Sequence, residues 1–117
     1  MAVSGLNVCY TTRDVFDGSY LGVSSHYEKF RNQDGTCIVV ANLSGTLTAG
    51  VAAGSAMATV PTGFRPVQTC YGSYYESGLN YARTVQIDSD GKIKPLFTMS
   101  NGNTVYVYFT YISTGKN

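Results

Sequence analysis

The residues that follow the triplet Gln33-Asp34-Gly35 alternate between apolar and polar side chains with a period of two. This is the spacing of a β-strand that is buried on one face only, because successive side chains of a strand point to opposite faces of the sheet. An Asp-Gly pair favours a hairpin turn, since it tolerates the positive φ angles that such turns need. The sequence therefore predicts a strand over residues 36–48 whose buried face carries Cys37, Val39, Ala41, Leu43, Gly45 and Leu47.

Shorter segments rich in β-branched and aromatic residues fill most of the remaining chain, and turn residues separate them. They predict strands over residues 6–12, 15–23, 26–32, 68–75, 79–87, 92–99 and 104–113. No window keeps the spacing of an amphipathic helix. Residues 49–58 are predicted as a loop that leads into a short strand ending at Val60, because Gly50 and Gly54 would each cost a helix about 1 kcal/mol. We expect one all-β domain over residues 1–117, an antiparallel β-sandwich of the jelly-roll-like kind.

The last predicted strand, residues 104–113, is apolar on both faces. Val105, Val107, Phe109 and Tyr111 share one face, and Tyr106, Tyr108 and Ile112 share the other. A strand that faces water on one side normally alternates apolar with polar residues. Two explanations stay open: a second subunit covers the outer face, or a second core layer or loop of the same chain covers it. Tyr106, Tyr108 and Ile112 are therefore candidates for an oligomer interface.

Charge is sparse: 13% of residues are charged and the formal net charge is +1, whereas an average domain has about 25% charged residues. A surface made largely of Ser, Thr, Asn, Gly and Tyr suits neutral partners such as sugars or other subunits. The eight Lys and Arg residues are scattered, so we expect no nucleic-acid partner. We also expect no signal peptide and no membrane insertion, because the apolar stretches are short and broken.

The sequence predicts no catalytic residue, no metal and no cofactor. His26 is the only histidine, and Cys9, Cys37 and Cys70 have no metal-ligand spacing, so we expect reduced, buried thiols. Residues 88–91, Asp-Ser-Asp-Gly, resemble the start of a calcium loop, but Met99 occupies the position that requires a bidentate Glu. A hairpin turn explains this segment, although cation binding by its two aspartates stays open. Most carboxylates lie at predicted turns, which makes a glycosidase the weaker alternative.

Tyrosine is the most distinctive component, with ten residues and no Trp. Several of them cluster around one predicted hairpin, together with an arginine and a glutamate. A tyrosine ring can pack on the C–H face of a sugar while its hydroxyl makes a hydrogen bond, although Tyr is also common in strands because it packs well there. The candidate ligand-binding residues are Tyr71, Tyr74, Tyr75, Glu76, Tyr81 and Arg83.

Two motifs lie between Leu43 and Phe97: the turn "VPTGFRP" at residues 60–66 and the later hairpin "VQIDSDGKI". They match a "lPaGyRP" turn and a "v.i...G.i.l" hairpin, and with them this segment resembles the C-terminal head domains of bacteriophage tail fibres and receptor-binding proteins. The prolines fix φ and the glycine permits a tight turn, so the motif itself is structural. It covers about half of the chain, and the first forty residues carry no family pattern.

The resemblance implies an antiparallel sandwich, usually a homotrimer, that recognises a host-cell surface component, often a saccharide. It further implies a virion protein that is made in the bacterial cytoplasm and contacts other tail proteins. It transfers no set of binding residues. Two alternatives remain: a structural virion component such as a fibre knob, collar or trimerisation cap without receptor binding, and a glycan depolymerase.

Overall fold

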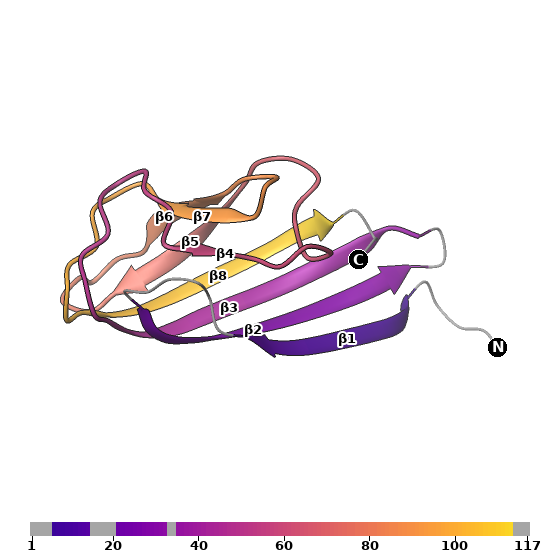
Figure 1. The fold of residues 1–117 in the computed structure, drawn as a ribbon, viewed down its shortest axis with the longest axis horizontal. Coiled ribbons are helices and arrows are strands. Elements are labelled where there is room, and N and C mark those ends of the chain that lie inside the picture. The colour runs from indigo at the N-terminus through magenta and orange to yellow at the C-terminus, as the bar shows by residue number, and fades with distance from the viewer. Residues whose placement is uncertain (1–5, 15–20, 33–34, 114–117) are drawn as a thin grey trace.

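Antiparallel pairing joins the strands of this protein into one sheet (Figure 1). The computed structural model describes residues 6–14, 21–32 and 35–113, with side chains for 28–31 and 35–113, and no helix occurs among them. The strands are β1 (Leu6–Asp14), β2 (Leu21–Asn32), β3 (Cys37–Leu47), β4 (Ala58–Thr59), β5 (Cys70–Glu76), β6 (Arg83–Ile87), β7 (Lys92–Pro95) and β8 (Thr104–Ser113). Their order in the sheet is β1-β2-β3-β8-β5-β6-β7-β4, which confirms the expected all-β, antiparallel class.

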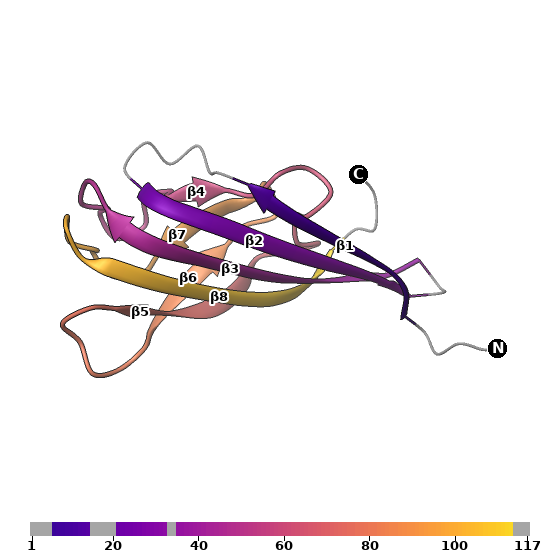
Figure 2. The ribbon, with the colours of Figure 1, turned by 90° about the horizontal axis from the view of Figure 1, so that it is seen from below.

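The sheet folds over on itself at the junction of β8 and β5. Figures 1 and 2 show β4 to β7 as one layer that lies over the layer of β1, β2, β3 and β8. The inner side chains of both layers belong to one core, so a single curled sheet produces the sandwich-like packing. Its main members are Val39, Ala41, Leu43, Leu47, Tyr74, Val85, Ile87, Ile93, Val105, Val107, Phe109 and Tyr111.

Strands β3 and β8 contribute most to this core because both alternate strictly. On β3, the predicted inner residues from Cys37 to Leu43 and Leu47 are buried, and only the side-chain-free Gly45 is partly accessible. On β8 the predicted Val105, Val107, Phe109 and Tyr111 are buried, and Ser113 at the end of the strand is buried as well. The register places the small Ala41 opposite Phe109, so the ring has room on the inner face.

The turn that links β4 to β5 packs against the end of β8. Gly63 adopts a φ of +95°, a conformation that favours glycine, between the rigid Pro61 and Pro66. Its carbonyl oxygen accepts hydrogen bonds from Lys29 Nζ at 2.5 Å and from Ser113 Oγ at 3.2 Å. The turn predicted from the sequence therefore has a structural role, because its hydrogen bonds connect β2 and β8 to the opposite layer.

Phe64 in the same turn also contacts β2 and β8. Its carbonyl oxygen accepts a hydrogen bond from the Tyr111 hydroxyl, and its ring lies 5.4 Å from the Lys29 ammonium. Lys29 is 1% exposed, and this burial lowers its pKa below the usual value. The donor contacts to the turn compensate part of the cost of burying the ammonium group.

Two predicted strands are shorter in the structure than in the sequence pattern. β6 begins at Arg83, because Gly78 (φ +93°) turns the chain and Leu79 N donates back to Glu76 O at 3.1 Å. The residues up to 82 then form a loop. β7 ends at Pro95, whose missing N–H interrupts the hydrogen-bond ladder.

Residues 15–20 of the predicted strand 15–23 and residues 33–34 of the predicted turn lie outside the described residues. The remainder, 21–23, belongs to β2 together with the separately predicted strand 26–32. His26 lies within β2, opposite Arg13 of β1 and Asn42 of β3. Of the described thiols, Cys37 is buried and Cys70 is partly buried, and both are free. Among these residues we find no helix with the length and apolarity to cross a membrane.

Candidate functional site: a tyrosine face and an end pocket

The predicted ligand-binding residues separate into two places, because they alternate along β5. Tyr71 and Tyr75 point outward from the sheet, whereas Tyr74 and Glu76 point inward and are buried. Arg83 lies opposite Tyr74 on the neighbouring strand, so it shares the inner side. The structure therefore brings Glu76 and Arg83 to one region and leaves Tyr71 and Tyr75 on the other side of the sheet.

The outward side of β5 and β8 forms a surface that we call the tyrosine face. It consists of Tyr71, Tyr75, Tyr106 and Tyr108, which are 39–63% exposed. Tyr75 and Tyr106 lie directly opposite each other, with ring centroids 6.1 Å apart and planes inclined by 32°. Such a cross-strand aromatic pair stiffens the surface while leaving its edges open to a partner.

The predicted interface residues extend the tyrosine face along β8. Tyr106, Tyr108 and Ile112 are 40%, 52% and 48% exposed. No segment of the described chain covers them. Residues 35–113 therefore do not supply the second core layer or loop that was one explanation for this apolar face. The oligomer itself stays a prediction.

A concave, polar site lies between the β5–β6 turn and the loop that leads into β8, and we call it the end pocket. Its volume is about 340 Å³, near the lower end of the range for small-molecule sites, roughly 300–1,000 Å³. The pocket is lined by Glu76, Ser77, Gly78, Leu79, Arg83, Thr98, Ser100 and Asn103.

Glu76 fixes the shape of the end pocket. Its carboxylate Oε2 accepts hydrogen bonds from Ser100 N at 2.9 Å and from Asn103 Nδ2 at 2.8 Å. The side chain is 3% exposed, and a buried carboxylate needs such donors. Ser77 reinforces the connection, because its N–H donates to Thr104 O at 2.9 Å and its Oγ accepts from Thr104 N at 3.0 Å.

Arg83 lies at the aromatic side of the end pocket. Its guanidinium carbon is 4.7 Å from the centroid of Phe97 and 5.7 Å from that of Tyr81. Nη2 donates a 3.4 Å hydrogen bond to the Tyr81 hydroxyl, which raises the pKa of Arg83 further above its usual value. Nε is buried and has no hydrogen-bond partner. Cation–π contacts and hydrogen bonds with the Tyr81 and Tyr74 hydroxyls hold the planar group in place. Each terminal nitrogen has two N–H donors, so the two tyrosine hydroxyls do not use all of them.

Tyr74 supports the pocket from the core. It is 1% exposed, and its hydroxyl donates a long, 3.4 Å hydrogen bond to the carbonyl oxygen of Phe97. Burial raises the pKa of Tyr74, so the phenol stays protonated and donating at neutral pH. Tyr74 is thus a core residue next to the site rather than part of its surface.

The sequence pattern indicated only half of the pocket. Ser100 and Asn103 lie between the predicted strands 92–99 and 104–113 and form a turn, in which Asn103 N donates to Ser100 O at 3.2 Å. Their contact with Glu76, 24 and 27 residues earlier, depends on the sheet order. Thr98 likewise gave no local pattern that pointed to a site.

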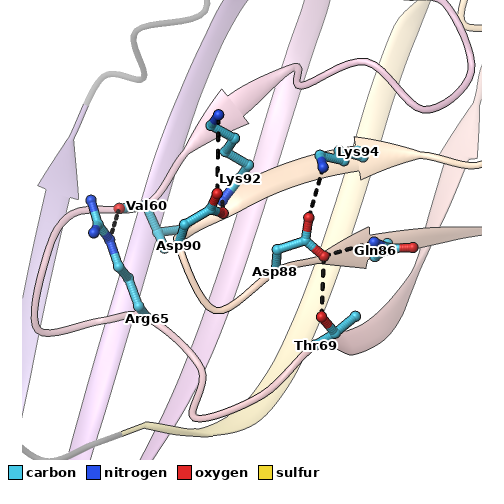
Figure 3. A network of polar contacts seen from close by, with 8 residues as sticks. All are labelled: Val60, Arg65, Thr69, Gln86, Asp88, Asp90, Lys92 and Lys94. Carbon is cyan, nitrogen blue, oxygen red and sulfur yellow. Dashed lines mark hydrogen bonds and ion pairs between the residues drawn. The ribbon is translucent and has the colours of Figure 1, made fainter.

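The aspartates considered for cation binding form a hairpin turn between β6 and β7 (Figure 3). Asp88 Oδ1 accepts hydrogen bonds from Gln86 Nε2 at 2.7 Å and Thr69 Oγ1 at 3.2 Å, and Oδ2 lies 2.8 Å from Lys94 Nζ. These contacts, with Lys94 the largest cause, lower the pKa of Asp88. In the part of the chain that is described, no three His, Cys, Asp or Glu side chains gather as metal ligands.

Comparison with known proteins gives no family for this chain. No family model matches the sequence, and no curated protein is significantly similar to it. The functional argument therefore depends on the geometry of the tyrosine face and the end pocket.

Proposed function

We propose that this protein is a receptor-binding head of the tail-fibre type that recognises a saccharide on the host-cell surface without catalysis. The observation that carries the proposal is the end pocket, where Glu76, Asn103 and Arg83 converge with the apolar Leu79. Hydrogen-bonding groups fix the orientation of a sugar, and an apolar side chain supplies a contact for its C–H face. The low charge of the chain favours a glycan in which most units are neutral, so that a single charged unit suffices for recognition.

The carboxylates support binding rather than hydrolysis. Glycosidases place two carboxyl groups across the scissile bond. Only one carboxylate, Glu76, is among the residues that line the end pocket, and hydrogen bonds to the neighbouring loop engage it. The depolymerase alternative therefore requires a second carboxylate that this lining does not supply.

The assignment to a phage tail rests on the resemblance of residues 60–66 and of the following hairpin. These residues form the turn that packs on the end of β8 and the hairpin of β6 and β7. A virion location, a host receptor and contacts with other tail proteins are part of the same proposal.

An array of bacterial surface polysaccharides tests the proposed function. We expect the purified protein to bind at least one of them, with millimolar or better affinity, and free glycan to compete for binding. We also expect the bound glycan to gain no new reducing ends over hours. Absence of binding to every glycan at about millimolar concentration, equivalent to less than about 4 kcal/mol of binding free energy, contradicts the proposal.

A structural virion component without receptor binding is the second candidate. The observation that favours it is the tyrosine face, because large rings and Ile112 remain exposed on central strands of the sheet. Extended apolar surface of this kind marks contact with another protein. A protein that assembles into oligomers but binds no glycan, and does not block adsorption of phage when added in excess, supports this second function.

A further inference from the structure

We propose that the end pocket binds an acidic sugar unit, with its carboxylate on Arg83 and its ring against Leu79. This inference rests on the proposed saccharide recognition and names the chemical class of the unit that the pocket selects. It makes Arg83 the residue that determines specificity, whereas Glu76 shapes the pocket.

Within residues 35–113, Arg83 forms no ion pair. Its contacts are the rings of Tyr81 and Phe97 and the hydroxyl groups of Tyr81 and Tyr74, none of which carries a counter-charge. Guanidinium groups bind carboxylates through paired N–H donors in one plane. Because Nε is covered, a ligand carboxylate reaches the terminal nitrogens of the guanidinium.

The carboxylate of Glu76 in the end pocket is already hydrogen-bonded. Glu76 Oε2 holds Ser100 N and Asn103 Nδ2 and forms no ion pair with Arg83. An incoming carboxylate therefore displaces no salt bridge. The negative charge of Glu76 still opposes a second anion, so we expect a modest preference for an acidic sugar rather than an absolute one.

The remaining lining groups suit a sugar ring. Leu79 provides an apolar contact, and Thr98, Ser100 and Asn103 line the pocket with hydroxyl and amide groups. A pyranose has one apolar face and a rim of hydroxyls, which matches this division. Its carboxylate then distinguishes an acidic sugar from the neutral sugar with the same hydroxyls.

Matched pairs of methyl glycosides test the inference with the whole chain. Methyl glucuronide is compared with methyl glucoside, and methyl galacturonide with methyl galactoside, since each pair differs only at C6. Chemical-shift titration of the backbone amides measures affinity and reports the location. We expect the acid of at least one pair to bind about fivefold more tightly, the gain of a partly exposed ion pair. The shifts should centre on residues 76–79 and 98–103.

Three variants separate specificity from folding. R83Q should remove the preference for the acid while retaining binding of the neutral sugar, and K92Q, which removes an exposed cation outside the pocket lining, should keep the preference. E76Q should increase the affinity for the acid, because it removes the opposing charge. Circular dichroism and thermal unfolding check that each variant is folded.

The outcomes distinguish this inference from the proposed function. Equal or tighter binding of the neutral sugars at the pocket overturns the acidic preference but leaves saccharide recognition intact. Shifts on the tyrosine face instead of the pocket overturn the location. An unchanged preference in R83Q overturns the role of Arg83. If no polysaccharide binds on the array, the proposed function fails first, and this inference with it.

Discussion

The two faces of β8 belong to the same backbone and share its register, yet one is buried in the core and the other is exposed. The inner residues Val105 and Val107 are fully buried, whereas Tyr106 and Tyr108 between them are 40% and 52% exposed. Burial of apolar area stabilises a fold by about 25 cal/mol per Å². The inner face therefore carries stability, and the outer face offers contact area whose loss leaves the fold intact. Substitutions on the two faces should separate these contributions.

The largest effect is expected from F109A. Phe109 is 3% exposed, packs edge-on against Tyr111 with centroids 6.4 Å apart, and lies opposite Ala41, which cannot fill the cavity. Loss of a buried Phe ring costs about 3–5 kcal/mol. Urea unfolding should show this decrease in the free energy of unfolding. A decrease below 1 kcal/mol, no more than for an exposed ring, would show that the inner face is not the core.

A smaller but substantial effect is expected from G72A, at the junction of the two layers. A Cβ on Gly72 would lie 2.3 Å from Tyr108 O and 2.7 Å from Phe109 Cδ1, so backbone or ring must shift. Overpacking of this kind typically costs about 1–3 kcal/mol. G78A measures backbone strain alone, because Gly78 has a φ of +93° and its Cβ would meet nothing within 4 Å, whereas Gly72 has no positive φ and G72A reports the steric clash. Equal stability of G72A and wild type would contradict the pairing of β5 with β8.

The sequence predicted the two faces of β8 correctly because alternation is a local property of a strand. The same rule, applied to β5, separates Tyr74 from Tyr71 and Tyr75, which clustering in the sequence had grouped as one site. Residues 79–82 were predicted as strand from their composition, yet the turn at Gly78 and the loop after it replace the strand there. Propensity therefore located strands but not their ends.

The end pocket could not be predicted from local patterns. Glu76 and Arg83 were candidates because they lie near tyrosines, but the donors to Glu76 come from Ser100 and Asn103, beyond two further strands. Which loop meets which turn depends on the order β8-β5-β6-β7, and the sequence alone does not specify this order. The sequence shows which side chains could bind a ligand, but it does not show which of them meet in one pocket.

On the outer face, Y108S tests contact rather than stability. Tyr108 is half exposed and lies opposite Ser73 and Asn42, so its loss should change the free energy of unfolding by less than about 1 kcal/mol. We expect wild type to show a mass in light scattering that is a multiple of the 12.6 kDa chain, and Y108S to shift towards one chain. T110S on the same face is the conservative control. A wild-type mass of one chain would remove the tyrosine face as an oligomer interface.

The smallest effect is expected from D88N, on the outer side of the β6–β7 hairpin, where polar contacts replace the tyrosines. Lys94, Gln86 and Thr69 stabilise the carboxylate and lower the pKa of Asp88 in the folded state. Its contribution is therefore present above the unfolded pKa of about 3.9 and is lost as the pH falls through the lower folded pKa. Because the pair is partly exposed, D88N should cost about 0.2–1 kcal/mol at neutral pH and less below about pH 4. Thermal unfolding of both proteins from acid to neutral pH measures the difference, and K92Q controls for loss of an exposed charge at the same hairpin. A stability difference that is independent of pH would mean that Asp88 acts through the shape of the turn. A difference that shrinks at low pH would mean that the charge of Asp88 stabilises this hairpin, whereas the tyrosine face is expected to act through its contact area.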